Sequence, residues 1–287
     1  MKNSNPTHAL VRQGRDKKQT NWIPIVLIGL SIGYISLIIY IPAINVFYQA
    51  FHRGIEPFLN NFSEPDFLNA VKTTLLIALI VVPINTVFGL CAAWSIARNQ
   101  FPGRTLLLSI IDLPLSISPV VAGLMIMLLY GSQGWFGKWF QDRGIEIVFA
   151  FPGMFLATAF VSMPFVVREV IPVLEEAGVD QEEAARTLGA SDWQIFWRVT
   201  LPNIRWGLMY GVLLTNARAM GEFGALSVVS GNVANRTQTL PLFVEDAYKQ
   251  YDTEAAFSAA VLLALLAAVT LIIKEILESK TRINDKS

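Results

Sequence analysis

The chain has 287 residues, of which 53% are hydrophobic and only 15% are charged, and its 22 basic and 22 acidic side chains leave no net charge. The mean hydropathy of +0.48 indicates a protein that folds in lipid, and the zero net charge excludes a broadly basic nucleic-acid binder. A single cysteine, Cys91, excludes a disulfide framework and a thiolate metal site within the chain.

Six apolar segments follow one another along the chain. Four of them lack any charged residue over lengths close to or beyond the roughly 20 residues that a helix needs to cross the hydrocarbon core: 19–52, 73–97, 147–167 and 255–273. Two others, 105–137 and 206–234, are interrupted only by Asp112, Arg218 and Glu222. The pattern predicts an all-α integral membrane protein with six transmembrane helices.

The distribution of basic residues sets the predicted orientation. Lysine and arginine are concentrated in the segments on one side of the six helices, which by the positive-inside rule is the cytoplasm. Both termini are then cytoplasmic, as tails at 1–21 and 280–287, and a transmembrane domain occupies 22–279. We expect a multi-pass protein of the plasma (inner) membrane, in contact with membrane lipid.

The third apolar segment is broken near its centre. Pro114 and Pro119 remove backbone donors, and such a break is tolerated in a membrane only where it is buried in protein or faces a cavity. Asp112 is expected to cap the helix that resumes after Pro114, and a role in transport is the less favoured alternative. Ser116 and Ser118 are candidates for lining a polar path, although serine also serves close helix packing in membranes.

The longest predicted cytoplasmic loop, about 173–203, carries two signatures of a helix start. Asp180 with Glu183, and Ser191 with Gln194, both match the capping box, in which two residues cap the first turn of a helix reciprocally. The loop is therefore predicted to contain two short helices.

A glycine elbow is expected between these helices. Gly189 supplies the left-handed conformation that commonly ends a helix. The second helix has Trp193, Phe196 and Trp197 on one face. It is expected to end ahead of Pro202, because proline disfavours helical geometry in the residue before it.

This loop resembles the EAA motif of ABC importer permeases. Glu183-Ala184-Ala185, Gly189 and Val199-Thr200-Leu201-Pro202 carry the resemblance, with valine where the family usually has isoleucine. It implies a type I ABC importer-like fold, in which the loop lies in a groove of a separate ATP-binding subunit. The residues that it assigns to ATPase coupling are Glu182, Glu183, Ala184, Ala185, Gly189, Trp193, Val199, Leu201 and Pro202. The alternative is an amphipathic helix pair that rests on the membrane interface with its tryptophans as anchors.

Two charges interrupt the fifth apolar segment. Arg218 and Glu222 stand four residues apart, so on a helix they share a face and neutralise each other. A charge near the bilayer centre costs about 3 kcal/mol, so both are expected to face the protein interior. They either border a transport path or its gate, or form a structural ion pair, and the sequence leaves these interpretations equal.

The surroundings of this pair resemble the oxyanion branch of the same permeases. The stretches that carry this resemblance are Ala217-Arg218-Ala219-Met220-Gly221-Glu222-Phe223-Gly224-Ala225, Leu226-Ser227-Val228-Val229-Ser230-Gly231 and Arg236-Thr237-Gln238-Thr239-Leu240-Pro241-Leu242. The second stretch is most similar to the W subunits of sulfate/thiosulfate permeases. The resemblance implies uptake of sulfate or thiosulfate, with molybdate or tungstate as the alternative. Ser116, Ser118, Arg218 and Glu222 then become candidate residues of an oxyanion path or gate.

The same resemblance implies the partners. A second, similar permease subunit, two copies of an ABC ATP-binding subunit and an extracytoplasmic sulfate-binding protein would complete the importer. The chain has no Walker A motif, so ATP is expected on the partner ATPases and no cofactor on this chain.

Other classes of function have less support. Only His8 and His52 are present, both outside the predicted helices, which leaves no histidine metal site and no intramembrane serine–histidine pair. No catalytic residue is therefore predicted, and an intramembrane enzyme is disfavoured. A secondary transporter or channel that needs no ATPase remains as an alternative; it would transport its substrate without a partner.

Overall fold

The computed structural model describes residues 22–284, and every regular element in that part of the chain is a helix. The predicted tail at 1–21 lies outside the described residues, as does the end of the other tail, 285–287. The chain divides into two compact units, Met1–Asn45 and Val46–Ser287.

The described part of the first unit is an apolar helical run that starts at Trp22. It comprises α1 (Trp22–Ile35), a π-helical turn η1 (Ser36–Tyr40) and the start of α2 (Ile41–Phe51), which continues into the second unit. The run Trp22–Phe51 has 30 residues and is apolar enough to cross a membrane.

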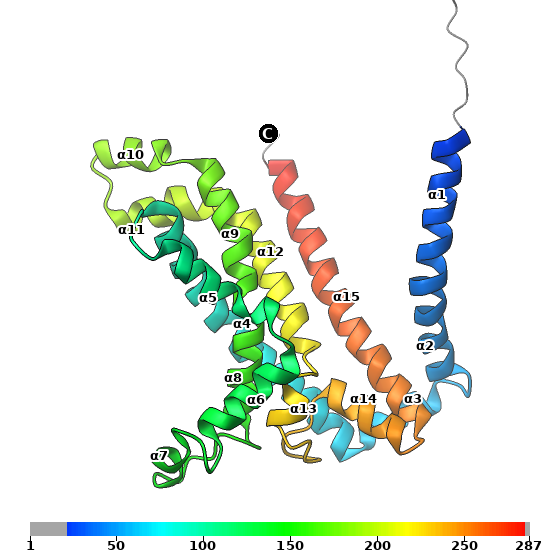
Figure 1. Cartoon of the computed structure of the whole chain (residues 1–287). Coiled ribbons are helices and arrows are strands. Elements are labelled where there is room, and N and C mark those ends of the chain that lie inside the picture. Colours follow the sequence, from blue (N-terminus) through cyan, green and yellow to red (C-terminus); the bar gives the residue numbers. More distant parts are fainter. Residues whose placement is uncertain (1–21, 285–287) are drawn as a thin grey trace, which may run out of the picture. The chain divides into compact units, whose positions relative to one another are not determined.

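The second unit contains the remaining helices. Their bounds are α3 (Glu56–Asn60), η2 (Asn61–Ser63), α4 (Pro65–Arg98), α5 (Arg104–Ser116), α6 (Pro119–Tyr130), α7 (Gly137–Gln141), α8 (Phe151–Ser162), α9 (Pro164–Ala177), α10 (Asp180–Thr187), α11 (Asp192–Ile195), η3 (Phe196–Thr200), α12 (Leu201–Met220), α13 (Leu226–Val229), α14 (Leu240–Lys249) and α15 (Thr253–Asn284). α10 and α11 lie at one end of this unit, where α15 also ends, whereas α7, α13 and α14 lie at the other end (Figure 1).

The number of membrane crossings follows from the long apolar helices. Four runs pass by length and composition in the described part of the chain: Trp22–Phe51, Pro65–Arg98, Phe151–Ala177 and Thr253–Ile272. α5 and α6 pass together as a bent pair, which raises the number to five if they form one crossing. α12 has 20 residues but carries Arg205 and Arg218, which reduce its apolar character. A multi-pass membrane protein is thus confirmed, while the number six stays a prediction.

The break in the third apolar segment is confirmed. α5 ends at Ser116, α6 begins at Pro119, and the two helices are bent by 110°. The backbone N–H at the first position of a helix has no partner within that helix, so Pro119, which lacks an N–H, fits at the start of α6. The capping role expected for Asp112 is wrong: this residue lies inside α5, and its carboxylate accepts a hydrogen bond from Arg168 on α9.

The predicted extent of the fifth helix is also wrong. α12 ends at Met220, so the segment 206–234 is not one continuous helix, and α13 is a separate short turn. The Glu222 carboxylate accepts the N–H of Ala225, which fixes a turn in place of a further helical turn. Glycine at positions 221 and 224 favours this helix end, because glycine loses the most conformational freedom in a helix.

The core helices α4 and α12 approach α9 closely where α4 and α12 carry glycine. A β-carbon at Gly207 would lie 2.7 Å from the Glu169 carbonyl oxygen, and one at Gly211 would lie 2.8 Å from the Val166 Cα atom. On α4, a β-carbon at Gly89 would lie 2.6 Å from the Val166 side chain. α9 is therefore held between α4 and α12 by small-residue contacts, the usual means of close packing in membranes.

We expect Gly211→Leu to destabilise the protein. The added side chain would have to enter the contact between α12 and α9, and overpacking of this kind typically costs about 1–3 kcal/mol. The thermal unfolding temperature of the detergent-purified transporter should fall. Leu214→Ala changes an exposed position three residues later and should leave that temperature nearly unchanged. Equal temperatures for wild type and Gly211→Leu would refute the close contact.

Candidate functional site

The glycine elbow is confirmed in the loop between α9 and α12. Gly189 follows α10 and has a φ of +84°, in the left-handed region that favours glycine. Ser191 and Gln194 form the predicted capping box at the start of α11, with both reciprocal hydrogen bonds present. The box predicted for Asp180 and Glu183 is wrong, because α10 already includes Asp180 and the Glu183 N–H donates to the Val179 carbonyl.

The helix that follows the elbow does not end before Pro202. α11, the π-helical turn η3 and α12 form one continuous helical run. Within η3 the Leu201 N–H donates to the Phe196 carbonyl, five residues back. In a regular α-helix the ring of Pro202 would clash with the preceding turn, and its nitrogen has no hydrogen to donate. The wider π-helical turn lies at this point and accommodates both effects. The loop that contains α10 and α11 is consequently joined to α12 without a break.

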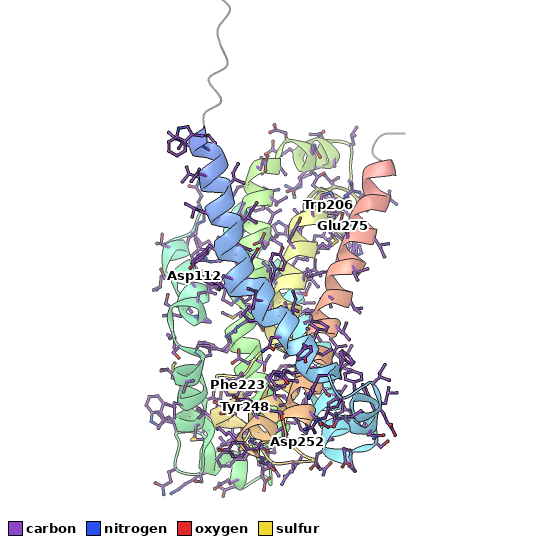
Figure 2. All side chains as sticks on the ribbon, turned by 90° about the vertical axis from the view of Figure 1, so that its right-hand side faces the viewer. Asp112, Trp206, Phe223, Tyr248, Asp252 and Glu275 are labelled. Carbon is purple, nitrogen blue, oxygen red and sulfur yellow. The ribbon has the colours of Figure 1, made fainter. Side chains whose placement is uncertain are left out.

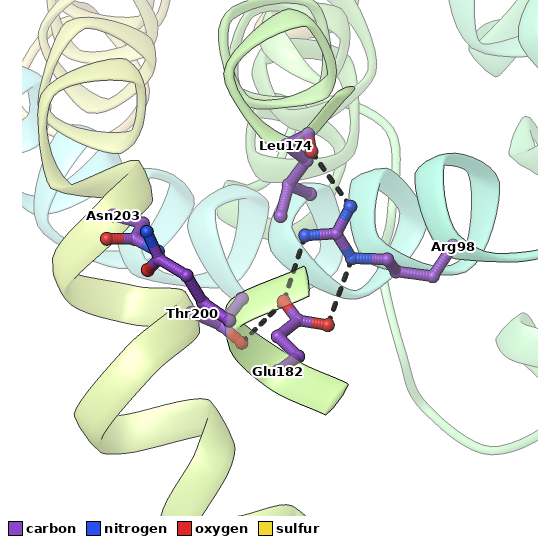
Figure 3. Close-up of polar contacts among 6 residues, drawn as sticks. Arg98, Leu174, Glu182, Thr200 and Asn203 are labelled. Carbon is purple, nitrogen blue, oxygen red and sulfur yellow. Dashed lines mark hydrogen bonds and ion pairs between the residues drawn. The ribbon is translucent and has the colours of Figure 1, made fainter. Parts of the chain in front are cut away.

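Glu182 links the loop to three other helices of the unit (Figure 3). Its carboxylate accepts hydrogen bonds from Arg98 at the end of α4, Nε to Oε2 at 3.2 Å and Nη2 to Oε1 at 2.9 Å. Thr200 Oγ1 in η3 donates to the same Oε1 at 2.9 Å, and Arg98 Nη1 donates to the Leu174 carbonyl of α9 at 2.8 Å. We call Arg98, Leu174, Glu182 and Thr200 the Glu182 cluster.

The Glu182 cluster is largely shielded from solvent. The side chains of Arg98 and Glu182 are 11% and 15% exposed, and Thr200 is buried. A bidentate arginine–carboxylate pair is stronger and more directional than an ordinary hydrogen bond. Glu182 therefore points into the chain and ties α10 to α4, α9 and α12. Sequence reasoning missed Arg98, which lies far from the loop in the sequence.

The aromatic face predicted for the second helix is confirmed. The rings of Trp193, Phe196 and Trp197 contact one another with centroids 5.4–6.1 Å apart, and Trp94 on α4 stacks on Phe196 at 5.1 Å. A groove of about 570 Å³ runs along these aromatic residues. Its other lining residues are Val87, Leu90, Cys91, Asp192, Leu201 and Leu208. The aromatic face thus lies against the apolar side of α4.

The outer surface of α10 is the most exposed part of the loop. Leu188 is 88% exposed, and Glu183 and Ala184 are exposed as well, whereas Ala185 is half-buried. Leu188 is thus an exposed leucine at the end of a short polar helix. Val199 is half-buried in η3, next to the Glu182 cluster.

The ion pair predicted at the end of α12 is present. Arg218 Nη2 lies 2.9 Å from Glu222 Oε2, and Glu222 Oε1 accepts the Ala225 N–H at 2.8 Å. The Glu222 carboxylate is 1% exposed, whereas the Arg218 side chain is 34% exposed. The carboxylate therefore faces the interior as predicted, and the guanidinium retains an accessible side.

The predicted path residues near the break, Ser116 and Ser118, and those at the end of α12, Arg218 and Glu222, come from segments that pack against each other. A β-carbon at Gly224 would lie 2.9 Å from the Pro119 side chain, and one at Gly123 would lie 2.7 Å from the Ala225 carbonyl oxygen. The turn that carries Glu222 thus packs directly against the start of α6. The break in the third segment and the end of α12 form one region, with Ser116 and Ser118 exposed beside it.

A second ion pair lies within the apolar helices and was missed from the sequence. Arg168 Nε on α9 donates to Asp112 Oδ1 on α5 at 2.8 Å. Arg168 directly follows the uncharged run 147–167, but the helical run Phe151–Ala177 continues for nine residues past it. The length of the helical run, and not that of the uncharged run, is the signal that includes Arg168 in this apolar helix.

The predicted motif after α13 has a structural role. Thr237 donates to the Ser230 carbonyl at 2.6 Å, and the Leu240 N–H donates to Thr74 Oγ1 on α4 at 2.8 Å. Thr237, Thr239 and Leu240 are buried. These contacts fasten the loop before α14 to α4. In the described part of the chain no group of three or more His, Cys, Asp or Glu side chains could hold a metal ion.

Comparisons with known proteins identify relatives over most of the chain. Residues 85–283 match the family model of binding-protein-dependent transport system inner membrane components. The sulfate transport system permease protein CysW of Synechocystis sp. is 66% identical over 259 residues, which cover 90% of this chain and 94% of that protein. CysW of Escherichia coli K12 is 49% identical, covering 94% and 93%, and the sulfate permease protein CysT of the same strain is 38% identical, covering 86% and 88%.

The fold has solved counterparts. A subunit of a bacterial ABC transporter that imports the polysaccharide alginate superposes with a TM-score of 0.75 at 18% identity, covering 90% of this chain and 96% of that one. The same transporter, in complex with its alginate-bound periplasmic protein, gives a TM-score of 0.73 at 18% identity, covering 88% and 92%. These neighbours establish the fold of an ABC importer permease.

Proposed function

The chain belongs to the family of binding-protein-dependent transport system inner membrane components, and on that premise we propose that it is the W-type permease subunit of an ATP-driven sulfate importer. The observation that carries the proposal is 66% identity to a sulfate permease protein CysW over 90% of the chain. The chain is a transport subunit and not an enzyme. Molybdate or tungstate as substrate is not favoured, since the relatives described above are sulfate permease proteins; thiosulfate is proposed as a second substrate.

The partners follow from the same relatives. The 38% identity to CysT supports a heterodimeric pair made of this chain and a CysT-type permease subunit. Two copies of an ATP-binding subunit would bind the ATP, and an extracytoplasmic sulfate-binding protein would deliver the anion. We propose six crossings of the plasma membrane, with α12 as the fifth and both termini in the cytoplasm.

In this proposal the loop between α9 and α12 couples the ATPase to the helices. The exposed residues Glu183 and Ala184 of α10, with Leu188 directly after its end, offer a surface to the ATPase. Ala185 and Gly189 shape the loop, and Trp193 stacks on Phe196, which in turn stacks on Trp94 of α4. The Glu182 cluster, with Val199, Leu201 and Pro202, would carry movement of the loop into α4, α9 and α12.

Uptake assays test the function. We expect a cell that lacks its own sulfate permeases to regain uptake of labelled sulfate when this chain is expressed with a CysT-type subunit, the ATP-binding subunit and the binding protein. Uptake should cease on ATP depletion, and thiosulfate should compete more strongly than molybdate. Uptake that persists without the ATP-binding subunit would support a secondary transporter, and stronger competition by molybdate would support the other substrate.

A further inference from the structure

The exposed polar residues of α5 form a stripe. Thr105, Ser109, Asp112 and Ser116 are spaced four, three and four residues apart, which places them on one face of the helix. Three of them are exposed, and the Asp112 side chain is 36% exposed. Another face of the same helix is apolar and open: Leu106, Ile110 and Leu113 are each exposed.

Arg168 extends this stripe onto α9. Its guanidinium contacts Asp112 at 2.8 Å and is 57% exposed. Asp112 lies between the levels of Trp206 and Phe223, so the pair lies well inside the second unit and away from its ends (Figure 2). Arg168 is also nine residues before Ala177, where the run Phe151–Ala177 ends.

The bilayer cannot cover this face at low cost. A charged side chain that faces the hydrocarbon centre costs about 3 kcal/mol on insertion scales. The stripe presents two charges and three hydroxyls, whereas the Leu106 face presents only hydrocarbon. Lipid therefore suits the Leu106 face, and water suits the stripe.

The stripe leads to the region of the ion pair between Arg218 and Glu222. It ends at Ser116, next to the break, and the turn that carries Glu222 packs against Pro119 just beyond the break. On α12, Arg218 follows Gly211, which contacts α9 at Val166, by seven residues or about 10 Å of helix. Arg168 and Arg218 are thus each paired with a carboxylate and keep an exposed side.

We infer that the stripe and Arg168 form a water-filled wall along which a tetrahedral oxyanion moves, with Arg168 as a binding residue and Asp112 as its counter-ion. The inference rests on the proposed sulfate transport and adds a second cation to the path. A site on a conduction path must bind its ion firmly enough to admit it and weakly enough to release it. Asp112 lowers the affinity of Arg168 for the anion, because the anion has to compete with the Asp112 carboxylate for the same guanidinium.

Cysteine accessibility in the assembled transporter tests the wall. In a Cys91→Ser background, Ser109→Cys and Ser116→Cys should react with a membrane-impermeant anionic methanethiosulfonate roughly tenfold faster than Leu106→Cys and Ile110→Cys, because only a hydrated thiol forms the reactive thiolate readily. Sulfate should slow the reaction at the stripe. Equal rates on both faces, or an unreactive stripe in variants that still transport, would overturn the inference and indicate packing against another subunit.

Asp112→Asn tests the counter-ion. With Arg168 released from its partner, we expect sulfate to protect Ser116→Cys at roughly tenfold lower concentration, the equivalent of about 1.4 kcal/mol. Arg168→Gln should abolish the protection. Unchanged protection in Asp112→Asn would refute the counter-ion role. Absence of sulfate uptake by the wild-type transporter would instead contradict the proposed function, and the relative reactivity of the two faces in the cysteine variants would still show whether the stripe faces water.

Discussion

Glu182→Ala is expected to separate ATP hydrolysis from sulfate uptake. The substitution leaves Arg98 nearly buried without its carboxylate and releases Thr200, so α10 loses its link to α4 and α9 and keeps the hydrogen bond between Gln181 and Asn203 of α12. Loss of hydrogen bonds to a charged group at such a site costs about 2–3 kcal/mol. In proteoliposomes of the complete importer, the sulfate taken up per ATP hydrolysed should fall at least about tenfold, since 1.4 kcal/mol already changes an equilibrium tenfold.

Arg98→Lys and Glu176→Gln sharpen this test. Lysine keeps the charge but cannot form the bidentate contact, so Arg98→Lys should also lower the ratio. Glu176 is an exposed carboxylate at the end of α9, and its neutralisation should change nothing. A normal ratio in Glu182→Ala would refute the mechanical role of the cluster, and failure of the variant to co-purify with the ATP-binding subunit would assign Glu182 to assembly.

Neutralising both members of the pair at the end of α12 is expected to abolish sulfate uptake. Arg218→Gln alone would strand the buried Glu222 carboxylate, and breaking a buried pair costs about 3–5 kcal/mol. In the double variant Arg218→Gln/Glu222→Gln no charge is left without a partner, so the protein should fold and assemble. If Arg218 attracts the anion, uptake by the double variant should still be lost, because its only change in charge is at the path.

The opposite outcome would make the pair structural. Normal sulfate uptake by the double variant, with assembly verified by co-purification of the other subunits, would remove Arg218 from the path. The matched control is Arg236→Gln/Glu146→Gln, which neutralises an ion pair that is more than half exposed. Exposed pairs contribute little to stability, so this control should assemble and transport like the wild type.

Local signals allowed the sequence to predict part of this structure. Gly189, the Ser191 capping box and the break around Pro114 and Pro119 depend on residues close in sequence, and all three were confirmed. The pair of Arg218 and Glu222 was also correct, although Glu222 lies past the end of the helix.

Contacts between distant residues could not be predicted in the same way. Arg98 and Glu182, or Asp112 and Arg168, lie on different helices, and only the packing of α4, α5 and α9 brings them together. The continuous helix through Pro202 was missed for another reason, because the rule for proline assumes a regular α-helix and not the wider π-helical turn. Transport itself involves subunits outside this chain, so no single sequence contains all of the path.

The loop between α9 and α12 differs in flexibility between its two ends, because the continuous helix makes the second end rigid. At its start, Gly178 and Gly189 bracket α10 with positive φ angles, and backbone rotation there is easy. At its far end, α11, η3 and α12 run on as a single rod into the membrane. A force on α10 would therefore rotate the backbone at the two glycines, whereas the run α11, η3 and α12 would move as one rigid helix. In the proposed importer, movement at the ATPase would then reach the far end of α12 by tilting of this helix and not by stretching of the loop. α12 has 20 residues and is therefore about 30 Å long.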